Sequence, residues 1–95
     1  MKKTILLKNG YDLDLQLVNC DIVKIDNYYY YDLTTNILKE NYNDTTETVD
    51  FLSDKDKKQI KKEALQLLLE IYQEIRQDNF TAKKIEQIKR YLKEN

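Results

Sequence analysis

Residues 12–17 read Asp-Leu-Asp-Leu-Gln-Leu, a strict alternation of polar and apolar side chains. Successive side chains of a β-strand point to opposite faces, so this period of two predicts a strand with one buried face. The Asn-Gly dipeptide just upstream is a hairpin signal. A loop of residues 8–10, with Gly10 in the left-handed region, sets Ile5 opposite Leu13 and makes one face apolar. Because register follows the buried face, we expect this loop rather than a two-residue turn.

The alternation continues downstream and predicts further strands. Residues 22–31 are expected to form one long strand that bends or bulges at Asp26-Asn27. Residues 32–36 have turn chemistry, because Asp can cap a turn with its own side chain and Asn tolerates the left-handed conformation. The segment 28–31 should therefore pair with a strand at 37–42, and a last strand should span 46–51. The side chains predicted to face the core share one parity: Val23, Ile25, Tyr29 and Tyr31.

The second half has the period of an α-helix. Ser53 is the predicted N-cap of a first helix, which carries a wide apolar stripe from Ile60 to Ile75 and ends near Asp78-Asn79. Such a stripe is too wide for one flat contact, so the helix should meet the sheet on one flank and the last helix, or a partner, on the other. Thr81 is the predicted N-cap of that last helix. A hydrophobic staple between Phe80 and Ile85 should accompany this cap.

These patterns predict a single α+β domain over residues 1–95. An antiparallel β-meander of four to five strands should occupy residues 1–52. A two-helix hairpin should occupy residues 53–95 and pack on one face of the sheet.

The composition argues against most enzyme chemistry. The chain has no histidine, one cysteine and one glycine. It therefore lacks the usual general base, the ligands of a structural zinc site and a glycine-rich phosphate loop. Asp12 and Asp14 share one strand face, which leaves an enzyme that uses carboxylates alone, or a hard-metal site, as an alternative. Alternating acids are also what a solvated face requires, and this is the favoured interpretation. We expect no enzyme activity, no catalytic residue, no bound metal and no cofactor.

The same composition indicates a compartment. A single cysteine excludes an internal disulfide, and a secreted domain of this size usually needs several. The apolar run near the N-terminus is shorter than a signal peptide needs, and no segment approaches the length of a membrane span. The expected localisation is cytoplasmic, without a membrane partner.

The run of four tyrosines at 28–31 offers candidate contact residues. With Tyr29 and Tyr31 in the core, Tyr28 and Tyr30 project from the opposite face. Tyrosine there is an ordinary strand residue, a protein-contact residue with large area and a polar tip, or a platform for base stacking. A second candidate contact surface lies on the first helix, at Leu65, Leu69 and Tyr72. Self-association as a homodimer is a further alternative to a different protein partner.

Lysines are the remaining candidate feature. The first half of the chain is net acidic and the second half net basic, and the total is −1. A solvated charged face is the simplest interpretation, and an AT-rich coding sequence also favours lysine and tyrosine. The functional interpretation is that these lysines contact an anionic partner. The lysines concerned crowd the start of the first helix: Lys55, Lys58, Lys61 and Lys62.

Size, mixed charge and surface tyrosines favour a protein-binding module without catalytic activity. Its partner is a protein whose identity the residues do not reveal. One form of this hypothesis is a small inhibitor or immunity-type protein of bacterial, phage or mobile-element origin that occludes a partner surface. The alternative is a nucleic-acid-associated protein that uses the lysine-rich helical half, although such proteins are usually more basic and richer in arginine.

Overall fold

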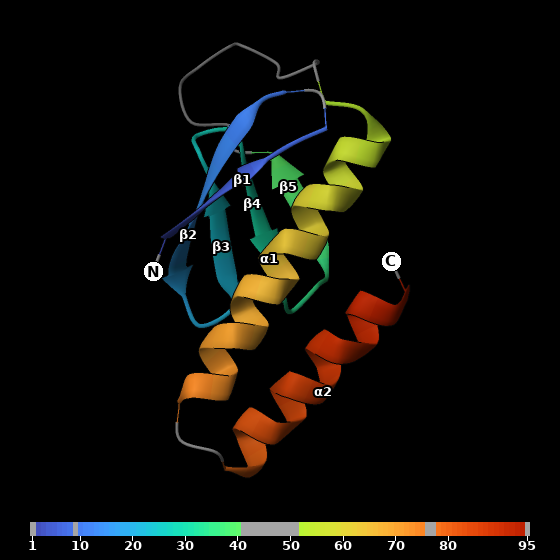
Figure 1. The fold of residues 1–95 in the computed structure, drawn as a ribbon. Helices are drawn as coiled ribbons and strands as arrows, with labels where there is room; N and C mark the ends of the chain where they lie inside the picture. The colour runs from blue at the N-terminus through green and yellow to red at the C-terminus, as the bar shows by residue number, and fades with distance from the viewer. Residues whose placement is uncertain (1, 9, 41–51, 76–77, 95) are drawn as a thin grey trace.

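The computed structural model describes residues 2–8, 10–40, 52–75 and 78–94. The strands pair antiparallel with their sequence neighbours, in the order β1-β2-β3-β4-β5. This arrangement, with two helices after the sheet, confirms the predicted α+β fold (Figure 1). The elements are β1 (Lys2–Leu6), β2 (Asp12–Asn19), β3 (Ile22–Ile25), β4 (Tyr29–Asp32), β5 (Ile37–Glu40), α1 (Asp54–Glu74) and α2 (Asn79–Glu94).

The β1–β2 hairpin has the predicted register. Ile5 lies opposite Leu13. The backbone N–H of Leu7 donates to the carbonyl of Tyr11 at 2.8 Å, which closes the predicted loop of residues 8–10. Gly10 has a φ of 94°, a conformation that other residues rarely adopt. The buried face thus decided the register, as expected.

The prediction of one long strand at 22–31 is wrong. The chain reverses through a turn at residues 26–28, and β3 and β4 form a hairpin in which Ile25 lies opposite Tyr29. Asp26 stands at a φ of 45° in this turn, a conformation that Asp tolerates better than most residues. The inward parity of the long-strand prediction nevertheless holds, because directly paired residues of a hairpin share a face.

The β4–β5 turn has the predicted chemistry. The Asp32 carboxylate accepts hydrogen bonds from the backbone N–H of Thr34 at 3.0 Å and from its hydroxyl at 2.6 Å. Asn36 adopts the left-handed conformation with a φ of 54°, and its side-chain oxygen accepts from the Tyr31 hydroxyl at 2.6 Å. The predicted strand at 46–51 and the end of the one at 37–42 lie outside the described residues.

The start of α1 is also as predicted. The Ser53 hydroxyl accepts from the backbone N–H of Asp56, whose carboxylate accepts in turn from the backbone N–H of Ser53, at 3.0 Å. This reciprocal pair satisfies two backbone donors that a helix start otherwise leaves free. The helix ends at Glu74, earlier than predicted, with Ile75 as its C-cap.

The predicted cap of the last helix is wrong. The carboxylate of Asp78, not the side chain of Thr81, caps α2 by accepting from the Thr81 backbone N–H at 2.8 Å. Hydrogen bonds from Thr81, chiefly from its backbone, hold the pKa of Asp78 below its usual value. With the cap three residues earlier, Phe80 falls inside the first helical turn. Its side chain is 62% exposed, so it forms no buried staple with Ile85.

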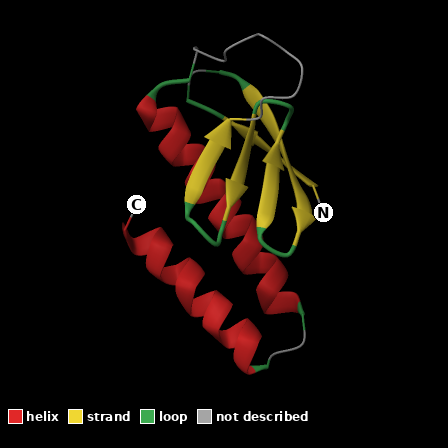
Figure 2. Ribbon diagram, turned by 180° about the vertical axis from the view of Figure 1, so that it is seen from behind, coloured by secondary structure: helices red, strands yellow, loops and turns green. Residues whose placement is uncertain are grey.

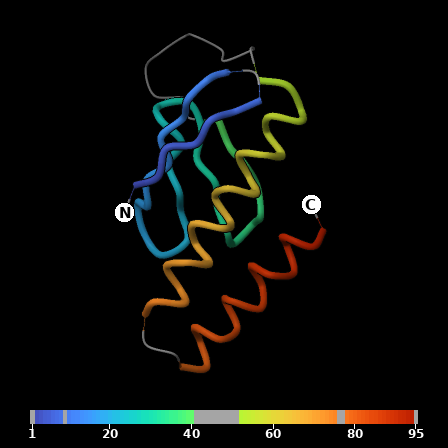
Figure 3. Tube along the Cα trace, viewed as in Figure 1, coloured from blue at the N-terminus to red at the C-terminus, as the bar shows by residue number. Residues whose placement is uncertain are grey.

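The core lies between the sheet and the helices. Helix α1 crosses one face of the sheet, and α2 runs back alongside α1 (Figures 1 and 3). The inner face of the sheet contributes Ile5, Leu13, Leu15, Val23, Ile25, Tyr29 and Tyr31, and α1 contributes Ile60, Ala64, Leu65, Leu67, Leu68 and Tyr72. The wide stripe of α1 thus meets the sheet on one flank and α2 on the other. Seen from behind, the opposite face of the sheet has no described element over it (Figure 2).

Candidate functional site

The open face of the sheet carries a continuous row of side chains across all five strands. The pairing registers place Lys2 opposite Gln16 and Gln16 opposite Lys24. They then place Lys24 opposite Tyr30 and Tyr30 opposite Lys39. Directly opposed residues of an antiparallel pair share one face, so these five form a single line. We call this line, Lys2-Gln16-Lys24-Tyr30-Lys39, the basic row.

The tyrosine run alternates as predicted, but only one of the two candidate anchors lies on a strand. Tyr29 and Tyr31 are 3% and 0% exposed, whereas Tyr30 is half-buried on the open face. The Lys39 ammonium lies 5.9 Å from the centre of the Tyr30 ring, within cation–π range. Tyr28 belongs to the β3–β4 turn and is 40% exposed. The two rings therefore do not form a pair along one strand.

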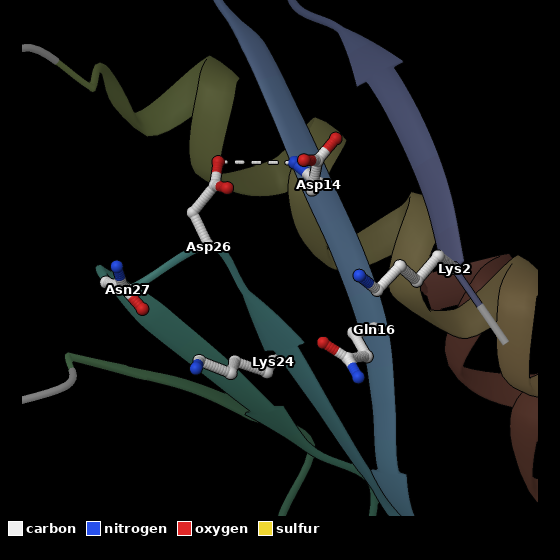
Figure 4. A pocket seen from close by; sticks show the side chains of 6 residues that line it. All are labelled: Lys2, Asp14, Gln16, Lys24, Asp26 and Asn27. Carbon is white, nitrogen blue, oxygen red and sulfur yellow. Dashed lines mark hydrogen bonds between the residues drawn. The ribbon is translucent and has the colours of Figure 1, made fainter.

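A shallow hollow of about 200 Å³ occupies the open face between β1, β2 and β3 (Figure 4). Three members of the basic row line one end of it: Lys2, Gln16 and Lys24. Lys2 lies beside Gln16, whereas the Lys24 ammonium points away from both (Figure 4). Asp14 and Asp26 lie at the other end (Figure 4). The hollow therefore has a cationic end and an anionic end. Asn27 completes its lining.

The two carboxylates of the hollow are already engaged within the sheet. Asp14 accepts a hydrogen bond from the Thr4 hydroxyl at 2.7 Å. Asp26 accepts from the backbone N–H of Asp14 at 3.2 Å, and its own backbone N–H donates to the Asp14 carbonyl at 2.9 Å. These bonds hold the β3–β4 turn against β2. The anionic end is thus a built part of the fold.

The lysines at the cationic end are less engaged. Over residues 2–8, 10–40, 52–75 and 78–94, the ion pairs join Lys3 to Glu63, Lys39 to Asp32 and Lys84 to Asp21, and include neither Lys2 nor Lys24. Lys39 is tied to Asp32 at 3.7 Å. Hydrogen bonds from Thr34 and the charge of Lys39 hold the pKa of Asp32 below its usual value.

The predicted contact surface on α1 belongs to the interior. Leu65 is 0% exposed and Tyr72 is 3% exposed, and Leu69 packs partly buried against the same core. The Tyr72 hydroxyl donates to the carbonyl of Cys20 at 2.8 Å and to the carboxylate of Asp21 at 3.0 Å. These side chains hold the helix to the sheet and offer little surface to a partner.

The four predicted lysines of α1 do not form one cluster. Lys58 and Lys61 line a second hollow, of about 260 Å³, between α1 and β5. Lys57 completes its basic side, and Glu40 places a carboxylate in the same lining. Lys55 and Lys62 are exposed and line neither hollow.

Sequence reasoning missed the basic row. Its members come from five strands, and only Tyr30 was singled out. The pattern that places Ile5 opposite Leu13 also places Lys2 opposite Gln16, so the β1–β2 part was available from the predicted register. The Lys24–Tyr30 pair required the β3–β4 hairpin, because a continuous strand at 22–31 never sets Lys24 beside Tyr30.

Three further observations concern the class of protein to which this chain belongs. Within the described ranges, no group of three or more His, Cys, Asp or Glu side chains could hold a metal ion. Among those residues, no helix is both long enough and apolar enough to cross a membrane. Comparisons of the chain with protein-family models, curated proteins and solved structures found no match.

Proposed function

We propose that this chain is a non-catalytic protein-binding module and that the open face of its sheet is the contact surface. The observation that supports this proposal most is the position of Tyr30. It is a half-buried aromatic ring on β4, beside the edge strand β5, on a sheet face that no described element covers, with lysines on both neighbouring strands. Aromatic residues with a polar tip are enriched where proteins meet.

The chemistry of the open face favours a non-obligate, transient complex with its partner. The face is polar and of mixed charge, with single apolar side chains such as Val18 and Ile37 exposed at one end of its strands. Obligate interfaces are more apolar than this, whereas non-obligate ones are about as polar as the rest of a protein surface. A small cytoplasmic protein of bacterial or phage origin that occludes a surface of its partner would use such a face.

A capture experiment tests this proposal. The tagged protein should retain a specific protein from a lysate of its source organism, and Tyr30→Ala should lose that protein. Truncation of an engaged aromatic anchor typically costs about 2 kcal/mol or more, which is roughly thirtyfold in affinity. Phe80→Ala is the matched control, because Phe80 is an exposed aromatic residue on α2. Equal retention by both variants, or no retained protein at all, would contradict the proposal.

Nucleic-acid binding is the second candidate, and the hollow between α1 and β5 favours it. Lys57, Lys58 and Lys61 line this hollow together. If they bind phosphates, the affinity for an oligonucleotide should fall steeply with salt, and the double variant Lys58→Glu with Lys61→Glu should abolish it. We expect no binding tighter than the non-specific range, about 10⁻⁴ to 10⁻⁶ M at physiological salt. A nanomolar complex with a defined oligonucleotide would reverse the order of the two candidates.

A further inference from the structure

The hollow on the open face is polarised, and this property indicates what it can receive. Lys2 and Gln16 lie beside each other on the side of the hollow away from Asp14 and Asp26, and Lys24 lines the same side with its ammonium pointing away from them (Figure 4). All three can donate hydrogen bonds to an anion. Neither lysine makes an ion pair with another described residue, so binding an anion there would break none of the ion pairs of this part of the chain.

The anionic end limits the kind of anion. Asp14 and Asp26 lie one pleat from the basic row, which is about 7 Å along a strand. Each carboxylate accepts a hydrogen bond within the sheet, which favours its present position. A nucleic-acid strand carries a charge at every nucleotide, and its neighbouring phosphates would approach these carboxylates. Like charges placed together at an interface are strongly unfavourable. A single carboxylate on a protein side chain avoids this repulsion.

We propose that the cationic end of the hollow, formed by Lys2, Gln16 and Lys24, receives an acidic side chain of the protein partner. The partner segment lies along the basic row, so that its acidic residue enters the hollow while its neighbours contact Tyr30. This inference rests on the proposed function and adds the chemistry of the partner: an acidic protein segment rather than a nucleic acid.

The test is an NMR titration of the full-length, isotope-labelled protein. The probe is a twelve-residue peptide of Ser with a single Glu at its centre and blocked ends. Its neutral counterpart has Gln in place of Glu. We expect saturable amide shifts at Gln16, Lys24 and Tyr30 with the Glu peptide and none with the Gln peptide. Shifts confined to the lysines of the helices, or no shift at millimolar peptide, would overturn the inference.

Two double variants decide whether the hollow is responsible. Lys2→Gln with Lys24→Gln should weaken peptide binding about tenfold, since each exposed charged contact is worth a factor of a few. Lys83→Gln with Lys89→Gln removes the same charge from exposed positions of α2 and should change nothing. Equal loss in both variants would mean that net charge alone attracts the peptide, and would overturn the inference.

Two more measurements separate this inference from the proposed function. A twelve-nucleotide oligothymidylate should bind the open face more weakly than the Glu peptide, and tighter binding there would overturn the acidic-segment inference. In the capture experiment, the partner could be lost with Tyr30→Ala but retained by the double variant Lys2→Gln with Lys24→Gln. That result would contradict only the acidic-segment inference. Retention of the partner by Tyr30→Ala would contradict the proposed function itself.

Discussion

Neighbouring tyrosines in the run 28–31 have different structural roles, because successive side chains of a strand point to opposite faces of the sheet. Tyr29 and Tyr31 pack under α1, and Tyr31 also donates its hydroxyl to Asn36. Burial raises the pKa of the Tyr31 phenol well above its usual value. Tyr30, between them, faces the open side. Identical residues at adjacent positions therefore allow structural and binding effects to be separated.

Alanine variants along the run should alternate in their effect on stability. Tyr29→Ala and Tyr31→Ala each remove a buried ring and should lower the free energy of unfolding by about 3–5 kcal/mol. Tyr30→Ala should lower it by about 1 kcal/mol or less, because Tyr30 is only half-buried. Urea denaturation followed by circular dichroism measures all three. Equal losses would show that the open face is covered in solution.

Helices and strands are joined by polar contacts as well as by the core. The Asp21 carboxylate, in the β2–β3 turn, accepts from the Tyr72 hydroxyl of α1 at 3.0 Å and pairs with the Lys84 ammonium of α2 at 3.2 Å. Burial, and then the hydrogen bond to Asp21, raise the pKa of the Tyr72 phenol. One side chain thus links a turn of the sheet to both helices.

Removal of this link should be costly. Asp21→Ala leaves the partly buried Tyr72 hydroxyl and Lys84 ammonium with fewer acceptors, and we expect a loss of about 2 kcal/mol in the free energy of unfolding. Asp12→Ala, which removes an exposed carboxylate from β2, should cost about 0.5 kcal/mol or less. Chemical denaturation at neutral pH compares the two variants. A similar cost in both would show that the contacts at Asp21 contribute no more than an exposed acid.

The two capping carboxylates make stability depend on acid. Asp32 and Asp78 have folded-state pKa values below the usual one, so their contribution is fully present above the unfolded value of about 4. It should be lost as the pH falls through the folded pKa values. Asn is as good a cap as Asp, so Asp78→Asn should keep its stability at pH 7 and lose less below pH 4. Urea midpoints at both ends of this range measure the difference, and parallel curves for the two proteins would contradict the assignment.

At the scale of the whole fold, the described residues form two layers, with helices over one face of the sheet and no described element over the other (Figure 2). The covered face contains fully buried side chains such as Leu15, Val23 and Ile25. Burial of apolar area is the main favourable term in folding, and a sheet without its helical layer would expose this area to water. The helices are therefore part of the same cooperative unit as the sheet.

A fragment of residues 1–53 should consequently fail to fold. It retains every described strand but lacks α1, so its apolar face has no cover and should drive collapse or aggregation. Two-dimensional NMR of the fragment, compared with the full chain, checks this prediction. A soluble fragment with dispersed amide resonances would show that the sheet needs no helices.

The sequence by itself determined the features that depend on local backbone geometry and short-range hydrogen bonds. Alternation assigns each strand residue to a face, turn chemistry identified the roles of Gly10, Asp32 and Asn36, and the helical period and the Ser53 cap defined the start of α1. These features follow from backbone sterics and from short-range hydrogen bonds. They need no knowledge of what lies across the core, and the α+β class follows from their order along the chain.

Beyond the β1–β2 hairpin, the tertiary structure decided which distant residues meet. Ile25 and Tyr29 lie on the same face whether residues 22–31 form one continuous strand or a hairpin that turns at 26–28. Alternation therefore cannot distinguish the two arrangements. The pairing of β3 with both β2 and β4 selects the hairpin. The same pairing assembles the basic row from five strands. It also buries Leu65 and Tyr72, which lie on the flank of α1 that faces the rest of the core. Contacts between residues distant in sequence depend on register and packing across the core, and no local period encodes them.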